Sequence, residues 1–168
     1  MSRDFRKYID ELNRNGCTVI ENFLTDEEIE SIKSEVPKLI DNFDFSSRRS
    51  VFETGENQAV EQDFLDSVDK ISFFYEKDAF DERGEFIVPK HQSINKIGHC
   101  LHMKNQVFKK ITFSQKVKAL IQQLGYKKPV VPQSMFIFKN PKIGGPVVPH
   151  KDGSFLYTEP DLDLVGLW

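Results

Sequence analysis

The chain has 168 residues, a length typical of one domain, and 39% of them are hydrophobic, including 15 Phe, which is ample material for a core. Its 23 basic and 26 acidic residues give a net charge of −3 and form no large block of one sign. This balance argues against nucleic-acid binding and against a polybasic membrane surface. No stretch approaches the roughly 18 apolar residues of a membrane span. We therefore expect a soluble globular protein with neither nucleic-acid nor membrane partners.

The two cysteines, Cys17 and Cys100, lie far apart and in no metal-binding spacing. They are interpreted as ordinary buried or half-buried thiols rather than as a disulfide framework. The charged N-terminus is not followed by the apolar region of a signal peptide. A reducing, cytoplasmic setting is the default expectation, and a peroxisomal location stays open.

The N-terminal segment predicts a helix followed by a strand. Apolar residues recur at helical spacing over residues 5–13, and Gly16 is expected to end this helix. Residues 17–20 are rich in β-branched side chains and follow that glycine directly, so they predict a strand.

A second helix is predicted to begin at Thr25, whose hydroxyl and the carboxylate of Glu28 have the spacing of a capping box. Pro37 falls inside its apolar pattern and is expected to kink the helix or to end its first segment. Residues 41–69 are polar and mixed, and they predict a long loop with little regular structure. A loop of this length in a compact domain is either a functional cover or a solvated excursion.

The middle of the chain predicts a hairpin and then two helices. Residues 70–75 are a strand candidate, with residues 86–88 as the expected antiparallel partner. Helices are predicted over residues 105–112 and 114–124, the second capped by Ser114.

The C-terminal part predicts strands. Residues 129–139 give the strongest strand signal in the chain, and residues 140–145 form a turn before a strand that carries His150 and Asp152. Residues 165–168 begin another strand. Helices first and strands later indicate an α+β domain that ends in an antiparallel β-core.

The sequence Pro-His-Lys-Asp-Gly around His150 is the main chemical motif. Side chains at i and i+2 of an extended strand share a face, so His150 and Asp152 would lie side by side with Lys151 turned away. An imidazole and a carboxylate supply two of the three ligands of a 2-His-1-carboxylate iron site. The alternative interpretation is a surface histidine and a turn-forming aspartate before Gly153.

Four ordered blocks resemble the phytanoyl-CoA dioxygenase family: residues 93–99, 133–139, 149–152 and 154–160. The resemblance runs from the first helix to the last residue. It implies a double-stranded β-helix, or jelly roll, with N-terminal helices packed on its outside. It also implies an Fe(II)- and 2-oxoglutarate-dependent dioxygenase that uses dioxygen to hydroxylate or oxidise a small or acyl substrate.

The resemblance also implies roles for five residues. His150 and Asp152 correspond to iron ligands, and Lys96, Met135 and Trp168 fall where the family's 2-oxoglutarate pocket lies. Lys96 offers a compact cation to a carboxylate, whereas Met135 and Trp168 offer apolar walls. Without these roles, Lys96 would be an exposed charge and the other two would be core residues.

The chain departs from the family pattern after its iron motif. Family members carry a distal His as third iron ligand and then an Arg for the far carboxylate of 2-oxoglutarate, but no His follows His150 and no Arg follows Arg83. We therefore expect residues 1–168 to be the N-terminal and central part of a single dioxygenase domain with an incomplete jelly roll. The alternative is a truncated, non-catalytic family member that acts as an interaction partner or is an unstable fragment. The sequence identifies neither the substrate nor the oligomeric state.

A second metal hypothesis uses His99, Cys100 and His102, because residues three apart share a helix face. A closed zinc site would need further ligands, and only Cys17 or His91 is available at a distance. Histidines that simply pack or face solvent are the alternative interpretation.

Overall fold

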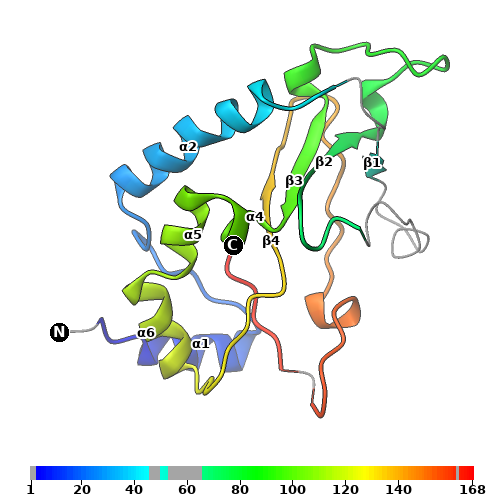
Figure 1. Ribbon diagram of the computed structural model, residues 1–168. Helices are drawn as coiled ribbons and strands as arrows, with labels where there is room; N and C mark the ends of the chain where they lie inside the picture. Colours follow the sequence, from blue (N-terminus) through cyan, green and yellow to red (C-terminus); the bar gives the residue numbers. More distant parts are fainter. Residues whose placement is uncertain (1–2, 46–49, 53–65, 162) are drawn as a thin grey trace.

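A computed structural model describes residues 3–45, 50–52, 66–161 and 163–168, and in it helices gather beside one sheet (Figure 1). The helices are α1 (Arg6–Asn15), α2 (Asp26–Asp41), α4 (Leu101–Lys104), α5 (Gln106–Thr112) and α6 (Gln115–Gln123). The strands are β1 (Ser50–Phe52), β2 (Ile71–Glu76), β3 (Ile94–His99) and β4 (Ser134–Ile137), and the short 3-10 turns are η2 (Lys77–Ala79), η3 (Lys90–Gln92) and η4 (Asp152–Ser154).

The sheet has the order β1-β2-β3-β4. β1 runs parallel to β2, whereas β2 with β3 and β3 with β4 are antiparallel. Phe74 pairs with Lys96, whereas the next residue, Tyr75, pairs with Ile94. Asn95 is therefore an extra residue in β3, as in a β-bulge. The mixture of helices and a largely antiparallel sheet agrees with the predicted α+β class. Within the described ranges there is this one sheet, so the jelly-roll prediction is not confirmed.

The predicted first helix is confirmed, but the strand predicted over residues 17–20 is wrong. α1 ends at Gly16, whose φ of 76° is left-handed and whose amide donates to the Leu12 carbonyl at 2.8 Å. Residues 17–20 are extended yet pair with no other strand in the described structure, and Val19 is 76% exposed. β-branched residues favour an extended backbone, but a strand also needs a neighbour.

The second helix begins as predicted, with both hydrogen bonds of the capping box present between Thr25 and Glu28. Pro37 does not end it, because α2 runs on to Asp41. The helix continues past the proline because Val36, the residue before it, is buried in the core. Tertiary packing therefore outweighs the missing amide.

The predicted hairpin between residues 70–75 and 86–88 is wrong, although its first strand is β2. The antiparallel partner of β2 is β3, and Phe86 makes only an isolated bridge to Phe80. β3 offers six consecutive buried residues and pairs on both edges, which stabilises it more than the short segment near Phe86. β1 lies inside the predicted loop 41–69. Residues 46–49 and 53–65 of that loop lie outside the described residues.

The two later helices are confirmed as α5 and α6, and Ser114 is the N-cap residue of α6 as predicted, but without the expected side-chain hydrogen bond. Ser114 makes no side-chain hydrogen bond to the first turn of α6, whereas Asn105 caps α5 by accepting from the amides of Val107 and Phe108. The strand predicted over residues 129–139 is shorter, since only β4 pairs.

The strands predicted around His150 and over residues 165–168 are wrong. The chain from Gly145 to Lys151 is extended but belongs to no ladder, and Asp152 begins the short turn η4. Pro146 and Pro149 lack the amide hydrogen that a ladder requires, and Asp-Gly-Ser favours a turn.

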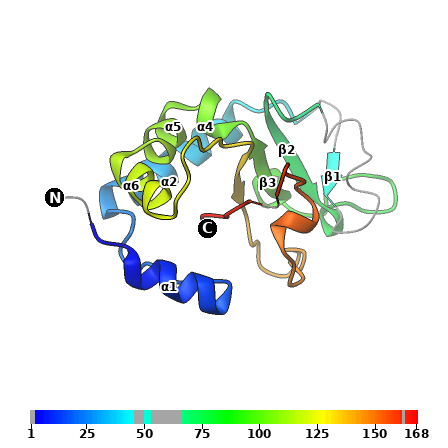
Figure 2. The ribbon, with the colours of Figure 1, turned by 90° about the horizontal axis from the view of Figure 1, so that it is seen from below.

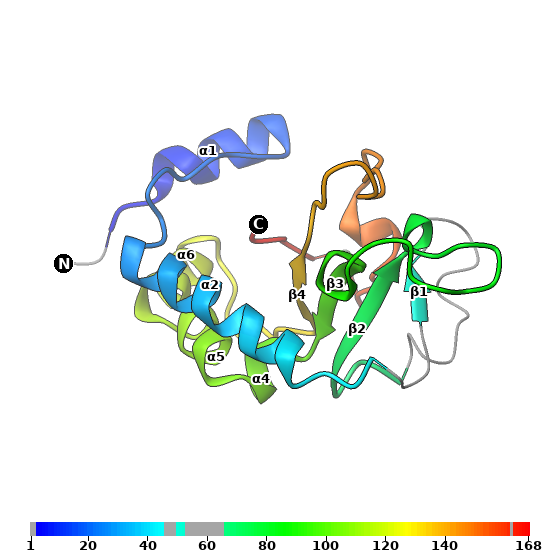
Figure 3. The ribbon, with the colours of Figure 1, turned by 90° about the horizontal axis from the view of Figure 1, so that it is seen from above.

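The two faces of the sheet have different partners. Phe73, Ile97 and Phe136 are register partners on one face, which packs with Val36 of α2 and Leu101 of α4 to form the core. In Figures 2 and 3, the C-terminal segment runs on the side of the sheet away from α2. Because side chains alternate along a strand, the next row across the sheet faces that second side. This row contains Phe74, Lys96 and Ile137.

Candidate functional site

Lys96 lies on the sheet face away from α2 and is almost completely buried, with 4% of its surface exposed. Its ammonium stands 5.1 Å from the centre of the Phe74 ring, which is its register partner on β2. Burial lowers the pKa of Lys96 from 10.5 to about 7. Lys96 is therefore a buried residue and not the exposed charge of the alternative interpretation.

Met135 lies on the same face as Lys96. It pairs across the ladder with Gly98, two residues after Lys96, and an added Cβ at Gly98 would lie 3.1 Å from Met135 Cγ. Glycine therefore leaves the space that the methionine side chain occupies. The structure brings these two predicted pocket residues onto one face, where Met135 supplies an apolar surface.

His99 is a buried residue beside Lys96 and contacts the same phenylalanine. Its ring centre is 5.2 Å from that of Phe74, and its Nδ1 lies 2.6 Å from the hydroxyl of Ser67. Burial, and then the charge of Lys96, lowers the pKa of His99 to about 4. The imidazole is therefore neutral at physiological pH.

The segment that carries His150 is held to the sheet by partly buried and exposed hydrogen bonds. Glu76, at the end of β2, accepts from the Gly145 amide at 3.0 Å and is 2% exposed. Asn140 donates to the carbonyls of Gln92 and Ile94 at 2.8 and 3.0 Å. These contacts fix the path of the chain five residues before His150.

His150 and Asp152 lie side by side as the motif predicted, although the backbone between them is not a ladder strand. His150 Nε2 is 3.2 Å from Asp152 Oδ1, and both side chains are about one-third exposed. The Nδ1 of His150 lies 2.8 Å from the Val148 carbonyl. In the tautomer whose Nδ1–H donates to this carbonyl, the lone pair on Nε2 faces Asp152 Oδ1. Because the carboxylate oxygen is also an acceptor, this tautomer suits a cation held between the two atoms.

This arrangement fits a divalent metal. Two ligand atoms about 2.1 Å from a metal and at right angles to each other are separated by about 3 Å. The separation between Nε2 and Oδ1 agrees with that value. The Nδ1–H bond to a backbone carbonyl is also the usual way in which a metal-binding histidine is oriented. The pair can therefore supply two adjacent ligands of an iron site, and the described residues supply no third ligand.

Trp168 approaches this pair at the end of the chain. An added Cβ at Gly166 would lie 2.9 Å from Trp168 Nε1 and 3.0 Å from Asp152 Oδ2. Glycine at this position permits the indole and the carboxylate to come close together. The Trp168 side chain is 83% exposed, so it is not the core residue of the alternative interpretation.

The second metal hypothesis receives no support from the geometry. His99 ends β3, whereas His102 lies in α4 with its Nδ1 2.8 Å from the Ser134 hydroxyl, so the two do not share a helix face. Across residues 3–45, 50–52, 66–161 and 163–168, no group of three His, Cys, Asp or Glu side chains is arranged to hold a metal. Cys17 is exposed, and Cys100 is buried.

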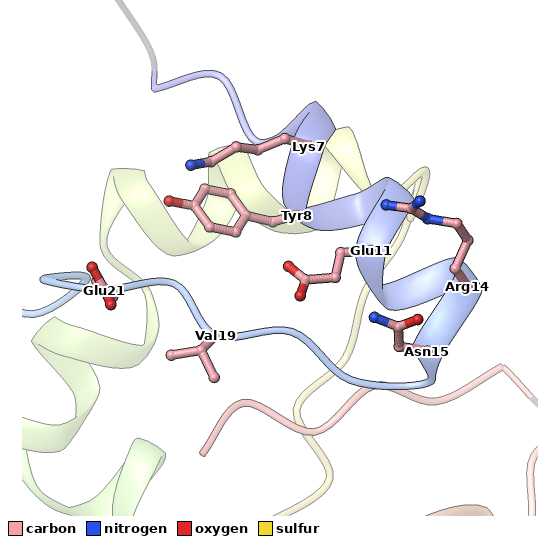
Figure 4. Close-up of a pocket in the computed structure, with 7 residues that line it drawn as sticks. All are labelled: Lys7, Tyr8, Glu11, Arg14, Asn15, Val19 and Glu21. Carbon is pink, nitrogen blue, oxygen red and sulfur yellow. The ribbon is translucent and has the colours of Figure 1, made fainter.

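A surface pocket of about 520 Å³ lies elsewhere, between α1 and the segment that follows it (Figure 4). Its lining consists of Lys7, Tyr8, Glu11, Arg14, Asn15, Val19 and Glu21. None of the predicted site residues contributes to it. It is open and lined by charges of both signs, so it lacks the apolar wall and the convergent polar groups of a ligand site.

The buried positions of Glu76, Ser67 and His99 are not evident from the sequence. Buried polar residues within an apolar strand are a recognisable signal, and His99 follows such a run in residues 94–98. Ser67 and Glu76 carry no such signal, because their contacts depend on residues 32 and 69 positions away.

The fold and these contacts define an α+β domain with a His–Asp pair suited to a metal and a buried cation on the sheet. The family model for phytanoyl-CoA dioxygenase (PhyH) matches residues 12–168. The chain therefore belongs to this family.

Three relatives illustrate the similarity. The chain is 46% identical over 158 residues to a phytanoyl-CoA dioxygenase domain-containing protein 1 homolog of Caenorhabditis briggsae, covering 92% of this chain and 55% of that protein. It is 45% identical over 160 residues to the mouse protein of that name, with the same coverage. It is 44% identical over 161 residues to an Arabidopsis thaliana phytanoyl-CoA dioxygenase, covering 95% and 56%. The chain therefore spans slightly more than half the length of these relatives.

Among the described residues, no helix is long and apolar enough to cross a membrane.

Proposed function

We propose that this chain carries two of the three protein ligands and part of the co-substrate pocket of an Fe(II)/2-oxoglutarate-dependent dioxygenase. Family membership supports the reaction class. The observation that carries the proposal is the 3.2 Å approach of His150 Nε2 to Asp152 Oδ1, with the other ring nitrogen bound to a carbonyl. The substrate is proposed to be a small or acyl molecule.

Each proposed residue has a distinct task. His150 and Asp152 present a lone pair and a carboxylate oxygen to Fe(II), and the Val148 carbonyl keeps the imidazole in the required tautomer. Lys96 pairs with a carboxylate of 2-oxoglutarate, Met135 supplies an apolar wall on the same sheet face, and Trp168 supplies a second apolar wall near Asp152. Bound there, Fe(II) would supply the redox chemistry that couples oxidation of 2-oxoglutarate by dioxygen to oxidation of the substrate.

Metal binding by the chain itself tests this proposal. Mn(II) is a suitable probe, because its free aquo ion gives an electron paramagnetic resonance signal that falls on binding. We expect His150→Ala and Asp152→Ala each to lower the affinity for Mn(II) at least about tenfold, since each removes one of two protein ligands. His91→Ala is the matched control, because His91 is exposed in η3.

Two results would contradict the metal assignment. One is a wild-type chain that does not reduce the Mn(II) signal at millimolar concentrations. The other is a His150→Ala variant that binds Mn(II) as tightly as wild type while His91→Ala binds less tightly.

A further inference from the structure

Two buried polar side chains, Lys96 and His99, lie near the ring of Phe74, and a third, Ser67, contacts His99. Lys96 and His99 come from β3, and Ser67 precedes β2. Lys96 Nζ and the His99 ring centre lie 5.1 and 5.2 Å from the centre of the Phe74 ring. All three polar side chains are at least 96% buried. The cluster therefore forms a compact polar group around Lys96, which shares a sheet face with Met135.

Burial and Lys96 together determine the protonation state of His99 in this cluster. His99 is neutral at physiological pH, because burial and the nearby ammonium both disfavour the imidazolium. The Ser67 hydroxyl, 2.6 Å from His99 Nδ1, can donate to that nitrogen. In that tautomer the ring proton lies on Nε2, so the imidazole is an uncharged hydrogen-bond donor.

We propose, on the basis of the function proposed above, that His99 is a further co-substrate-binding residue, whose Nε2–H donates to the carboxylate of 2-oxoglutarate that pairs with Lys96. Ser67 is then a positioning residue that fixes the tautomer of His99. A carboxylate has about four lone-pair sites, so an ammonium alone leaves acceptor capacity unused. A neutral donor fills it without burying a second charge, which would raise the desolvation cost.

Nuclear magnetic resonance of the chain tests this proposal without any variant. Glutarate is the probe, because it has the two carboxylates of 2-oxoglutarate but lacks the 2-oxo group that a metal would chelate. In chain labelled with ¹⁵N at histidine and lysine, we expect His99 Nδ1 to be unprotonated and Nε2 to be protonated. Addition of glutarate is expected to shift the resonances of His99 Nε2–H and Lys96 Nζ with the same apparent affinity.

Two matched substitutions separate the donor from mere packing. In His99→Gln the amide nitrogen occupies nearly the position of Nε2, whereas in His99→Asn the side chain reaches only the position of Nδ1. We expect His99→Asn to bind glutarate about tenfold less tightly, as for loss of one hydrogen bond to a charged group, and His99→Gln to stay within about threefold of wild type. His91→Asn, at an exposed histidine, is expected to bind like wild type.

The outcomes distinguish this inference from the proposed function. If glutarate shifts the Lys96 resonance but not that of His99, or if Nε2 is unprotonated when glutarate is bound, the role of His99 is refuted while Lys96 keeps its role. If neither resonance responds to saturating glutarate, the co-substrate site itself is refuted, and the role of His99 is refuted with it.

Discussion

Replacing Lys96 with methionine should stabilise the folded chain at neutral pH. Lys96 is 4% exposed, and burial lowers its pKa from 10.5 to about 7 in the folded state. Between these values the unfolded chain binds more protons than the folded chain, so the contribution of Lys96 to the free energy of unfolding rises with pH. The charged form therefore costs stability at and below pH 7, and the cost disappears as pH approaches 10.5.

The size of this effect follows from the two pKa values. The full depression corresponds to roughly 5 kcal/mol at low pH, falling to about 4 kcal/mol at pH 7 and about 2 kcal/mol at pH 9. Methionine keeps most of the length of the lysine side chain without its charge. We expect Lys96→Met to raise the free energy of unfolding by about 1–4 kcal/mol at pH 7, with a smaller gain at pH 9.

Urea unfolding followed by helical circular dichroism between pH 6 and pH 10 measures this difference. Lys118→Met is the control, because Lys118 is exposed on α6 and its loss should change stability little. The reasoning would be refuted if Lys96→Met were no more stable than wild type at pH 7. It would also be refuted if the gain were the same at pH 7 and pH 9.

Two further predictions concern stability. Leu101→Ala should lower the free energy of unfolding by about 2–5 kcal/mol, because Leu101 is fully buried between the helices and the sheet, whereas Met103→Ala at an exposed position of α4 should cost much less. Thr25→Ala should cost about 1 kcal/mol by removing the capping box of α2, and Thr25→Ser should restore most of the loss. Urea unfolding checks both pairs, and equal losses within a pair would contradict the prediction.

Local patterns predicted the helices well, because caps and apolar spacing act over a few residues. Thr25 with Glu28 and the left-handed Gly16 are such local signals. Strand pairing depends on distant partners, which local sequence does not reveal. The predicted pairing of residues 86–88 with β2 is wrong for this reason, and the sequence does not identify residues 94–98 as the central strand. The strand predicted over residues 129–139 is too long for the same reason, because only Ser134–Ile137 finds a neighbour in the sheet.

The candidate site was predicted unevenly. The spacing of His150 and Asp152 indicated their proximity, since two residues of extended chain suffice to bring their side chains together. Family resemblance suggested Lys96, Met135 and Trp168, but their roles stay predictions. Burial of Lys96 and the bond between Ser67 and His99 depend on packing across β2 and β3, which one sequence does not reveal.

The division of the sheet into two faces has a consequence for inherited variation. Phe73, Ile97 and Phe136 support the core, while Phe74 and Lys96 stand one residue away on the other face. A substitution in the first set should reduce the amount of folded protein in a cell, whereas one at Lys96 should alter ligand handling in protein that still accumulates. Adjacent codons in this gene can therefore produce different molecular defects, and abundance measured together with ligand binding would separate them.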